Sequence, residues 1–370
     1  AKPGGLFLRR PYQKDVERAR RRKTRQCLKT LEYINVSGLA GEKMKRTTNS
    51  AFVLSLDFEL FWGVYESRGS EYYPAIENVF KVVPNLLGLF EKYGISCTWA
   101  TVGALCLEDV EAFDRYKPKN LPKYVNKSLS PYEDVSNIAS FNKKLLFAPE
   151  LVSQILRTPW QEIGAHTFSH FYTLEPGASI EDFRSDLEAN LSVAEARSIE
   201  LQSVVFPRNQ FNSDYLAVCH SAGFRSYRGN PRHWASKIVI GSKINIFRRA
   251  FRLIDAYFPL SGNLTHSMKL RKEHGIYDVP ASLFFRAFNK KLKFLEYLKI
   301  KRMKFSMTSA AKKGRLCHFW WHPHNFAFNL EDNLAQIEEL LKHFKVLEEK
   351  YGMKSMNMSG IASMQEKIND

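Results

Sequence analysis

Strand-like and helix-like segments alternate along this chain from about residue 50 to residue 351. Short apolar runs typical of buried strands are followed by longer segments in which apolar residues recur with helical spacing. This repeated order predicts a parallel sheet whose strands are connected by helical crossovers. The expected strands cover 51–57, 95–102, 162–165, 204–206 and 316–321, and the expected helices cover 76–93, 149–157, 179–199, 213–222 and 330–351.

Side chains that can take part in chemistry follow several of these expected strands. Two acids end the first strand at Asp57 and Glu59, and Arg208 follows a later one. In a (β/α) barrel the carboxyl ends of the strands converge on one face, so this distribution favours a barrel over an open sheet. The first strand is not followed by a glycine-rich phosphate loop, which argues against a nucleotide-binding Rossmann fold.

His166 and His170 lie four positions apart, directly after the strand expected over 162–165. If the chain turns helical at His166, the two imidazoles project from one face, one turn apart. Neutral imidazoles in that geometry can bind one divalent metal ion. A pair with this spacing is also common as a purely structural feature, so the rest of the chain has to supply further ligands.

The acids of the first strand could complete such a site. At strand spacing Asp57 and Glu59 point to the same side, where two carboxylates are costly unless a cation or an arginine balances them. One carboxylate and two imidazoles make a three-ligand site with open positions for water, as in catalytic zinc sites. The second carboxylate can act as a base, Arg208 can keep it ionised, and His322 can protonate a leaving amine. These groups predict metal-assisted hydrolysis of an amide or ester; the alternatives are a surface arginine and a packed core histidine.

With these motifs the chain resembles the polysaccharide deacetylases (NodB homology, carbohydrate esterase 4) over roughly residues 50–350. The segment His166-Thr167-Phe168-Ser169-His170 matches the family's His-(Ser/Thr)-x-x-His motif in full. The segment Ala100-Thr101-Val102-Gly103 is similar to the family's second strand. The resemblance implies an α/β fold, a distorted (β/α)7-type barrel with parallel strands.

Other motifs depart from the family pattern. The family has adjacent aspartates where this chain has Asp57-Phe58-Glu59. The family's arginine is followed by prolines, whereas Arg208 is preceded by Pro207 and followed by Asn-Gln. The fourth motif, an aspartate with a tryptophan, has only Asp278 as a weak counterpart.

The resemblance implies a role for each site residue. Asp57 is expected to be the catalytic base, with the reverse assignment of Asp57 and Glu59 left open. His322 is expected to be the catalytic acid, with His324 as the alternative. A divalent metal ion, expected to be zinc, is the implied cofactor. The predicted sites are catalytic (Asp57, His322, Arg208), metal-binding (Glu59, His166, His170) and substrate-binding (Trp62, His324, Asn209).

The barrel does not account for the whole chain. Residues 1–48 are predicted to be a basic N-terminal extension with a helix near residues 14–34. The barrel is expected over residues 49–356, and residues 357–370 are expected to be a C-terminal tail. Within the barrel, residues 107–146 and 230–315 break the strand–helix rhythm and are predicted to be insertions.

The charge and composition of the chain indicate which classes of binding partner to expect. The net charge is +17, with 55 Lys and Arg against 38 Asp and Glu, so phosphate-bearing partners are favoured. Residues 284–298 mix aromatic, leucine and lysine side chains at helical spacing, which suits a helix on an anionic membrane surface or, equally, one packed on the barrel. The five scattered cysteines are typical of reduced thiols, and no apolar signal core is present. A cytoplasmic protein is expected, with peripheral attachment to the inner membrane as a further hypothesis.

The implied activity is removal of an N-acyl group, acetyl or formyl, from an amino sugar. The resemblance favours enzymes of bacterial surface-polysaccharide synthesis, lipopolysaccharide included, whose sugars are carried on a nucleotide or a polyprenyl phosphate. One alternative is a catalytically inactive carbohydrate-binding relative. Another is a nucleic-acid-binding protein, which the charge alone suggests and for which the sequence has no recognised motif.

Overall fold

The computed structural model describes residues 49–238, 240 and 246–369 of the chain. The N-terminal extension predicted over residues 1–48, with its helix near residues 14–34, lies outside these described residues. None of the described helices is long and apolar enough to cross a membrane.

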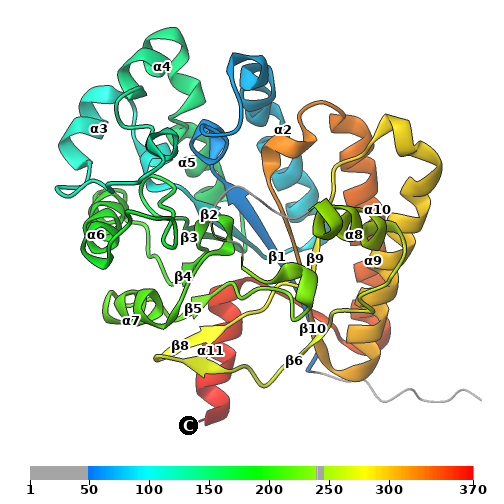
Figure 1. The fold of residues 1–370 in the computed structure, drawn as a ribbon. Helices are drawn as coiled ribbons and strands as arrows, with labels where there is room; N and C mark the ends of the chain where they lie inside the picture. The colour runs from blue at the N-terminus through cyan, green and yellow to red at the C-terminus, as the bar shows by residue number, and fades with distance from the viewer. Residues whose placement is uncertain (1–48, 239, 241–245, 370) are drawn as a thin grey trace, which may run out of the picture. The chain divides into compact units, whose positions relative to one another are not determined.

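One curled sheet of mostly parallel strands lies at the centre of the described chain (Figure 1). The strand order is β6-β10-β1-β2-β3-β4-β5-β8-β7, with β11 paired to β1 and β9 paired to β10. Among the described strands, antiparallel pairing is confined to the β6–β10 and β7–β8 pairs. The strands cover Ala51–Phe58 (β1), Cys97–Thr101 (β2), Gln161–Ala165 (β3), Ser203–Val204 (β4), Ser226–Tyr227 (β5), His266–Ser267 (β6), Lys272–Glu273 (β7), Ile276–Asp278 (β8), Leu283–Phe284 (β9), Arg315–Trp321 (β10) and Lys354–Met356 (β11).

One extended segment, residues 276–285, joins the two sides of this sheet. Its first half, β8, pairs parallel with β5, and its second half, β9, pairs parallel with β10. Between them the Val279 amide donates to the carbonyl of Tyr227 at 2.9 Å, and the Ser282 amide donates to the carbonyl of His318 at 2.8 Å. The predicted distorted (β/α) barrel is therefore confirmed. The barrel is irregular where this single segment takes the place of two separate strands.

Helices connect the strands and cover the sheet. In α2 the buried residues follow helical spacing from Ile76 to Phe90, and Gly94 ends the helix with a left-handed φ of 64°. Ser179 begins α6 with a capping box that includes Asp182. The helices cover Tyr73–Tyr93 (α2), Val110–Tyr116 (α3), Val135–Asn142 (α4), Pro149–Arg157 (α5), Ile180–Ala196 (α6), Ser213–Ser221 (α7), Ile246–Tyr257 (α8), Lys293–Lys313 (α9), Leu330–Tyr351 (α10) and Met358–Asn369 (α11).

The structure differs from the sequence-based expectations in three segments. Residues 230–315, predicted to be an insertion, contain β8 and β9 and so provide part of the barrel itself. The helix expected over 284–298 begins only at Lys293, because the preceding residues pair with β10 as β9 and then turn. The expected tail, residues 357–370, includes α11, whose Ile361 and Ala362 are buried.

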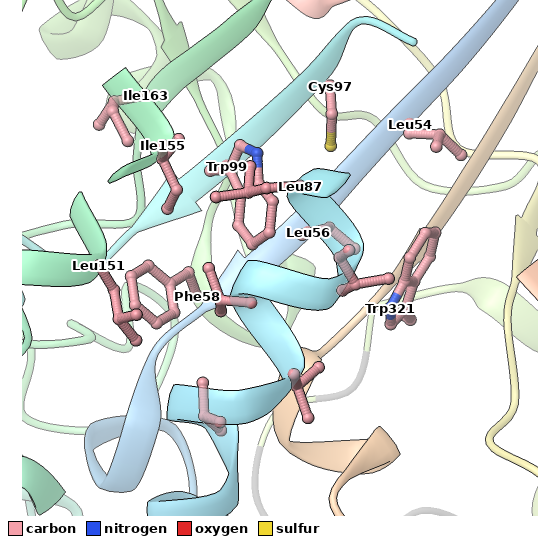
Figure 2. Close-up of a cluster of buried hydrophobic side chains, with 14 of the residues drawn as sticks. Leu54, Leu56, Phe58, Leu87, Cys97, Trp99, Leu151, Ile155, Ile163 and Trp321 are labelled. Atoms are coloured by element: carbon pink, nitrogen blue, oxygen red, sulfur yellow. The ribbon is translucent and has the colours of Figure 1, made fainter. Parts of the chain in front are cut away.

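β1 lies in the hydrophobic core, and all eight of its residues are buried. Figure 2 shows Leu56 and Phe58 of β1 beside Trp99 of β2, with Leu87 of α2 over them. The rings of Phe58 and Trp99 meet edge to face, with centroids 6.2 Å apart. Because parallel strands flank β1 on both sides, its carboxyl end is held in a fixed position, which is where Asp57 and Glu59 lie.

The cysteines of the described residues are free thiols buried in the fold. Burial raises the pKa of the Cys106 thiol to about 12, which disfavours its reactive thiolate form. This agrees with the expectation of reduced cysteines that pack as small apolar side chains. Cys27 lies outside the described residues.

Leu86→Ala is expected to lower the free energy of unfolding by about 2–5 kcal/mol, because it leaves a cavity in the hydrophobic core. Leu86 is fully buried on the core side of α2. Lys81→Ala, on the exposed side of the same helix, is the control and should change stability by less than about 0.5 kcal/mol. Urea unfolding followed by circular dichroism measures both; equal effects would contradict the assignment of the core face.

Candidate metal and catalytic site

The two histidines of the His-x-x-x-His motif lie on a loop after β3, so the helical turn considered for His166 does not form. Thr167 and His170 have left-handed backbone φ angles of 61° and 62°, which a helix would not contain. The buried Asp186 of α6 holds this loop, accepting hydrogen bonds from the amides of Phe168 at 2.6 Å and Ser169 at 3.2 Å. The loop, rather than a helix, therefore brings the imidazoles together.

A close approach by the loop after β2 fixes the other side of this histidine loop. The Gly103 amide donates to the carbonyl of Thr167 at 2.9 Å. A Cβ atom at Gly103 would lie 2.3 Å from the Asn190 side-chain oxygen and 3.3 Å from the Phe168 Cα. Only glycine fits this contact without a shift, so the segment at 100–103 supports the histidine loop directly.

Glu59 and the two histidines converge on one point. Glu59 Oε2 lies 3.3 Å from His166 Nε2 and 3.2 Å from His170 Nε2, and one ligand atom from each residue falls within 4.8 Å of the others. His166 Nδ1 lies 2.7 Å from the Val205 carbonyl, which can only accept, so Nδ1 carries the proton. In the neutral ring, His166 Nε2 then has a free lone pair, and this buried atom has no hydrogen-bond partner among the described residues.

The electrostatics of these three side chains suit a cation. Burial lowers the pKa of His170, which favours its neutral, ligating form. Burial opposes ionisation of Glu59, but the neighbouring imidazoles, His322 foremost, hold its pKa well below its usual value. A carboxylate oxygen and two imidazole nitrogens that face one another in a buried space are the donor set of a divalent metal site. The residues therefore fit a divalent metal ion.

Asp57 forms a buried ion pair with an arginine that the sequence analysis did not identify. Arg228, at the end of β5, donates to Asp57 Oδ1 at 2.5 Å and to Oδ2 at 2.8 Å. The guanidinium also lies over the Trp320 ring, 4.2 Å from its centroid. Burial alone would raise the pKa of Asp57, but the charge of Arg228 and its hydrogen bonds lower it. Asp57 is therefore held as an oriented carboxylate beside Glu59.

Arg208 does not make the contact expected of it. Its guanidinium pairs with Glu66 at 2.5 Å and Glu175 at 2.9 Å, and it lies over the Tyr172 ring. The turn that contains Arg208 has a left-handed φ of 54°, which directs the chain away from the strand direction after β4. The arginine that pairs with Asp57 is Arg228, whereas Arg208 lines the same cavity in a separate ion-pair network.

Asn209, predicted to bind substrate, lies between these elements. Its side-chain oxygen accepts hydrogen bonds from Arg228 Nε at 3.2 Å and from the second terminal nitrogen at 3.0 Å. Its backbone carbonyl accepts from the Asn230 side chain at 3.0 Å. Asn209 lines the cavity and also fixes the guanidinium that orients Asp57.

The two histidines after β10 have different surroundings. His322 Nε2 lies 3.6 Å from Asp57 Oδ2 and 3.7 Å from Glu59 Oε1, and the ring lines the cavity. His324 is buried behind it, with its ring stacked on His322, and it is not part of the cavity wall. Burial lowers the pKa of His324 to about 3, so this imidazole is neutral. The expected substrate contact of His324 is therefore not available in this structure.

Two further candidates lie outside the cavity. Trp62, predicted to bind substrate, is a core residue whose Nε1 donates to the carbonyl of Leu146 at 2.9 Å. It packs against Phe113 because the turn after β1 directs it under the helical segments at 110–142. Asp278, the weak counterpart of the fourth motif, pairs with Arg232 at 3.4 Å and does not line the cavity.

Arg228 and Asp186 contact the candidate site but were not recognised from the sequence. Arg228 follows β5, a strand of only two described residues, Ser226–Tyr227, which is too short to give a periodic signal. Asp186 lies within a helix, where an acid ordinarily indicates an exposed position. Its buried side chain, however, faces the histidine loop. One signal for Arg228 was available in the sequence. A charged residue that directly follows a strand of a (β/α) barrel is expected at the face where the carboxyl ends of the strands converge.

Most of the candidate residues line one cavity of about 600 Å³: Asp57, Glu59, His166, His170, Arg208, Asn209 and His322. Asp57 and Glu59 come from the end of β1, the histidine loop follows β3, and His322 follows β10. These strands are neighbours or near neighbours in the sheet, and all three run parallel, so their carboxyl ends open on the same side (Figure 1).

No protein-family model matches this sequence, and no curated protein matches it. Solved structures do match. A putative polysaccharide deacetylase from Mycobacterium smegmatis has a TM-score of 0.57 at 13% identity, covering 87% of this chain and 92% of that one. The Puue allantoinase has a TM-score of 0.52 at 13% identity, covering 87% and 91%. A probable polysaccharide deacetylase from Pseudomonas aeruginosa PAO1 has a TM-score of 0.49 at 11% identity, covering 87% and 92%.

The first two of these similarities establish the fold. The chain has the NodB-type barrel of the polysaccharide deacetylases, as the resemblance of its motifs predicts. An allantoinase matches at nearly the same TM-score, so the fold by itself does not select the substrate. The side chains that line the cavity, and not the fold, determine which reaction this chain can catalyse.

Glu59→Gln, His166→Ala and His170→Ala are each expected to lower the affinity for a divalent metal ion, tested with zinc, by about tenfold or more, because each removes one candidate ligand from a three-residue site. Asp57→Asn should keep the metal, since Asp57 pairs with Arg228 instead. Zinc per chain after dialysis, measured by inductively coupled plasma mass spectrometry, gives the result. His220→Ala, at an exposed histidine of α7, is the control. Loss of zinc in Asp57→Asn with retention in Glu59→Gln would reverse the two assignments.

Proposed function

We propose that this protein is a metal-dependent hydrolase that removes an N-acyl group, acetyl or formyl, from an amino sugar. The observation that carries the proposal is the convergence of Glu59, His166 and His170 beside a second carboxylate, Asp57, that is held by an arginine. A deacetylase-type activity agrees with the fold of the structural neighbours.

Glu59, His166 and His170 would hold the metal ion, for which we propose zinc. A divalent cation there supplies a Lewis acid that favours attack of water on an acyl carbonyl. Val205 fixes the His166 ring by accepting from Nδ1, so the ligand nitrogen is presented without rearrangement.

Asp57 is the proposed general base. Its carboxylate is buried, is ionised through its contact with Arg228, and lies on the cavity wall beside Glu59. Ser55 Oγ accepts a hydrogen bond from the same guanidinium at 3.1 Å, which further restricts the orientation of the arginine. A base fixed in this way can take a proton from water without first losing side-chain entropy.

His322 is the proposed general acid. Its Nε2 faces both carboxylates, and its Nδ1 lies 3.3 Å from the Asn325 side-chain oxygen. The ring is partly exposed, at 23% of the side chain, so it can reach a leaving amine and exchange protons with solvent. His324 stacks behind it and restricts its position.

The proposed substrates are N-acylated sugars of bacterial surface-polysaccharide or lipid-linked glycan synthesis. The cavity wall combines the aromatic rings of Phe284 and Trp320 with the amides of Asn209 and Asn230. Aromatic faces with nearby amide groups are suited to sugar rings, which have apolar faces and hydroxyl edges. A cytoplasmic location stays a prediction.

The zinc-loaded full chain is expected to release acetate or formate from N-acetylated or N-formylated amino sugars in a coupled assay. Asp57→Asn should lower kcat by about 10²–10⁴-fold while zinc content is unchanged, because only the base is lost. Asp114→Asn, an exposed acid of α3, should behave as the unmodified chain. Sugar binding without acyl release by the zinc-loaded chain would instead favour the inactive carbohydrate-binding alternative.

We also propose peripheral association with an anionic membrane, which two neighbouring helices support. The apolar side chains of α8 include Ile246, 74% exposed, and those at the start of α9 include Phe294, 77% exposed, and Tyr297. Basic residues lie among them, Arg249 on α8 and the lysines at 290–293. Exposed apolar side chains surrounded by positive charge are complementary to an anionic lipid surface.

Phe294→Ser combined with Tyr297→Ser is expected to lower sedimentation with phosphatidylglycerol vesicles by about tenfold, because two apolar contacts with the bilayer are lost. Phe141→Ser, at an equally exposed phenylalanine of α4, is the matched control and should change nothing. Binding of the unmodified chain to neutral phosphatidylcholine vesicles should be weak. Equal sedimentation of all three proteins would contradict this membrane surface.

A further inference from the structure

Part of the cavity wall carries positive charge that the proposed hydrolysis does not use. Arg252 of α8 and Arg286, which follows β9, both line the cavity and are both half-buried. Neither guanidinium forms an ion pair with a carboxylate in the described ranges 49–238 and 246–369, whereas Arg208 and Arg302 in the same wall do. Two cations are therefore held in a confined space without a counterion from the described chain.

The surroundings of Arg252 and Arg286 make their unpaired positive charges energetically unfavourable. Burial lowers the pKa of Arg286, and burial together with the charges of Arg248 and Arg286 lowers the pKa of Arg252. Arg252 Nε donates to the carbonyl of Ala235 at 2.8 Å, which orients the guanidinium but supplies no negative charge. Half-buried like charges that repel each other are stabilised by an anion placed between them.

The position of Arg286 connects this charge to the reacting end of the cavity. In the parallel pairing of β9 with β10, Phe284 is opposite Trp320, and their ring centroids are 4.7 Å apart. Two residues further along each strand come Arg286 and His322, and all four side chains line the cavity. Arg252 reaches the same wall because α8 packs against α9 beside it (Figure 1).

We propose that Arg252 and Arg286 form a binding site for a phosphate group attached to the amino sugar, so that the substrate is a glycosyl phosphate or diphosphate. The inference rests on the proposed function for the identity of the sugar. Guanidinium groups bind phosphate through paired, charge-assisted hydrogen bonds. Aromatic rings and the proposed acid His322 lie on the same wall, so a sugar bound there can place its phosphate on the arginines and its N-acyl group toward Glu59.

Direct binding tests the site without requiring activity. The full chain, with and without zinc, is titrated with inorganic pyrophosphate by isothermal calorimetry. Arg252→Gln and Arg286→Gln are each expected to weaken binding by about tenfold or more, since each removes charge-assisted hydrogen bonds. Arg115→Gln is the control, because it removes an exposed arginine of α3 that lies outside the cavity wall. Equal weakening by Arg115→Gln, or no weakening by either cavity variant, would overturn the site.

Steady-state kinetics then distinguishes a nucleotide-linked sugar from a polyprenyl-phosphate-linked sugar as the substrate. Three N-acetylglucosamine compounds are compared: the neutral methyl glycoside, a uridine-diphosphate-linked form and a short polyprenyl-phosphate-linked form. Arg286→Gln should lower kcat/KM at least tenfold for whichever phosphorylated form the chain uses, and leave the methyl glycoside unchanged. A proportional loss on all three would contradict a phosphate site. Absence of turnover on every compound together with arginine-dependent pyrophosphate binding would contradict the proposed function while leaving the phosphate site supported.

Discussion

The buried ion pair between Asp57 and Arg228 is the interaction on which the arrangement of the site depends. It joins the end of β1 to the end of β5 across the barrel, and Arg228 adds contacts to Asn209 after β4 and to Trp320 of β10. Removing two charges from water costs several kcal/mol per ion, so such a pair is maintained only where further hydrogen bonds satisfy both partners. Here those bonds are present, and they leave Glu59 as the carboxylate that is free to face the histidines.

The cavity has regions of different charge, because some of its charged side chains have partners of opposite charge and others do not. Beside β1 and β3, carboxylate and imidazole lone pairs converge and favour a cation. Arg208 is balanced by Glu66 and Glu175. Along β9 and α8 the arginines lack carboxylate partners among the described residues and favour an anion. A substrate with an amide to be hydrolysed and a phosphate to be held would match both regions.

Much of the fold could be predicted from the sequence, because strand and helix periodicities are local. The helices 149–157 and 330–351 have the predicted bounds, and Gly94 and Ser179 end and begin helices as expected. Residues 276–285 could not be assigned, because two short strands with different partners have no periodic pattern. The prediction that Trp62 binds substrate was wrong for a related reason. The sequence shows that Trp62 is close to the two acids along the chain, but it does not show the direction of the turn that buries the side chain.

For the site, the sequence by itself determined which chemical groups are available: two acids after one strand, a pair of histidines after another, and a histidine after the strand expected over 316–321. Only the tertiary structure decided their partners. In the folded chain Asp57 pairs with Arg228 rather than with Arg208. His166 and His170 reach Glu59 from a loop that Asp186 holds, rather than from a helix. The physical reason is that spacing along a strand sets the side to which a residue points, whereas ion pairs and ligand sets depend on segments far apart in the chain that meet only when the sheet curls.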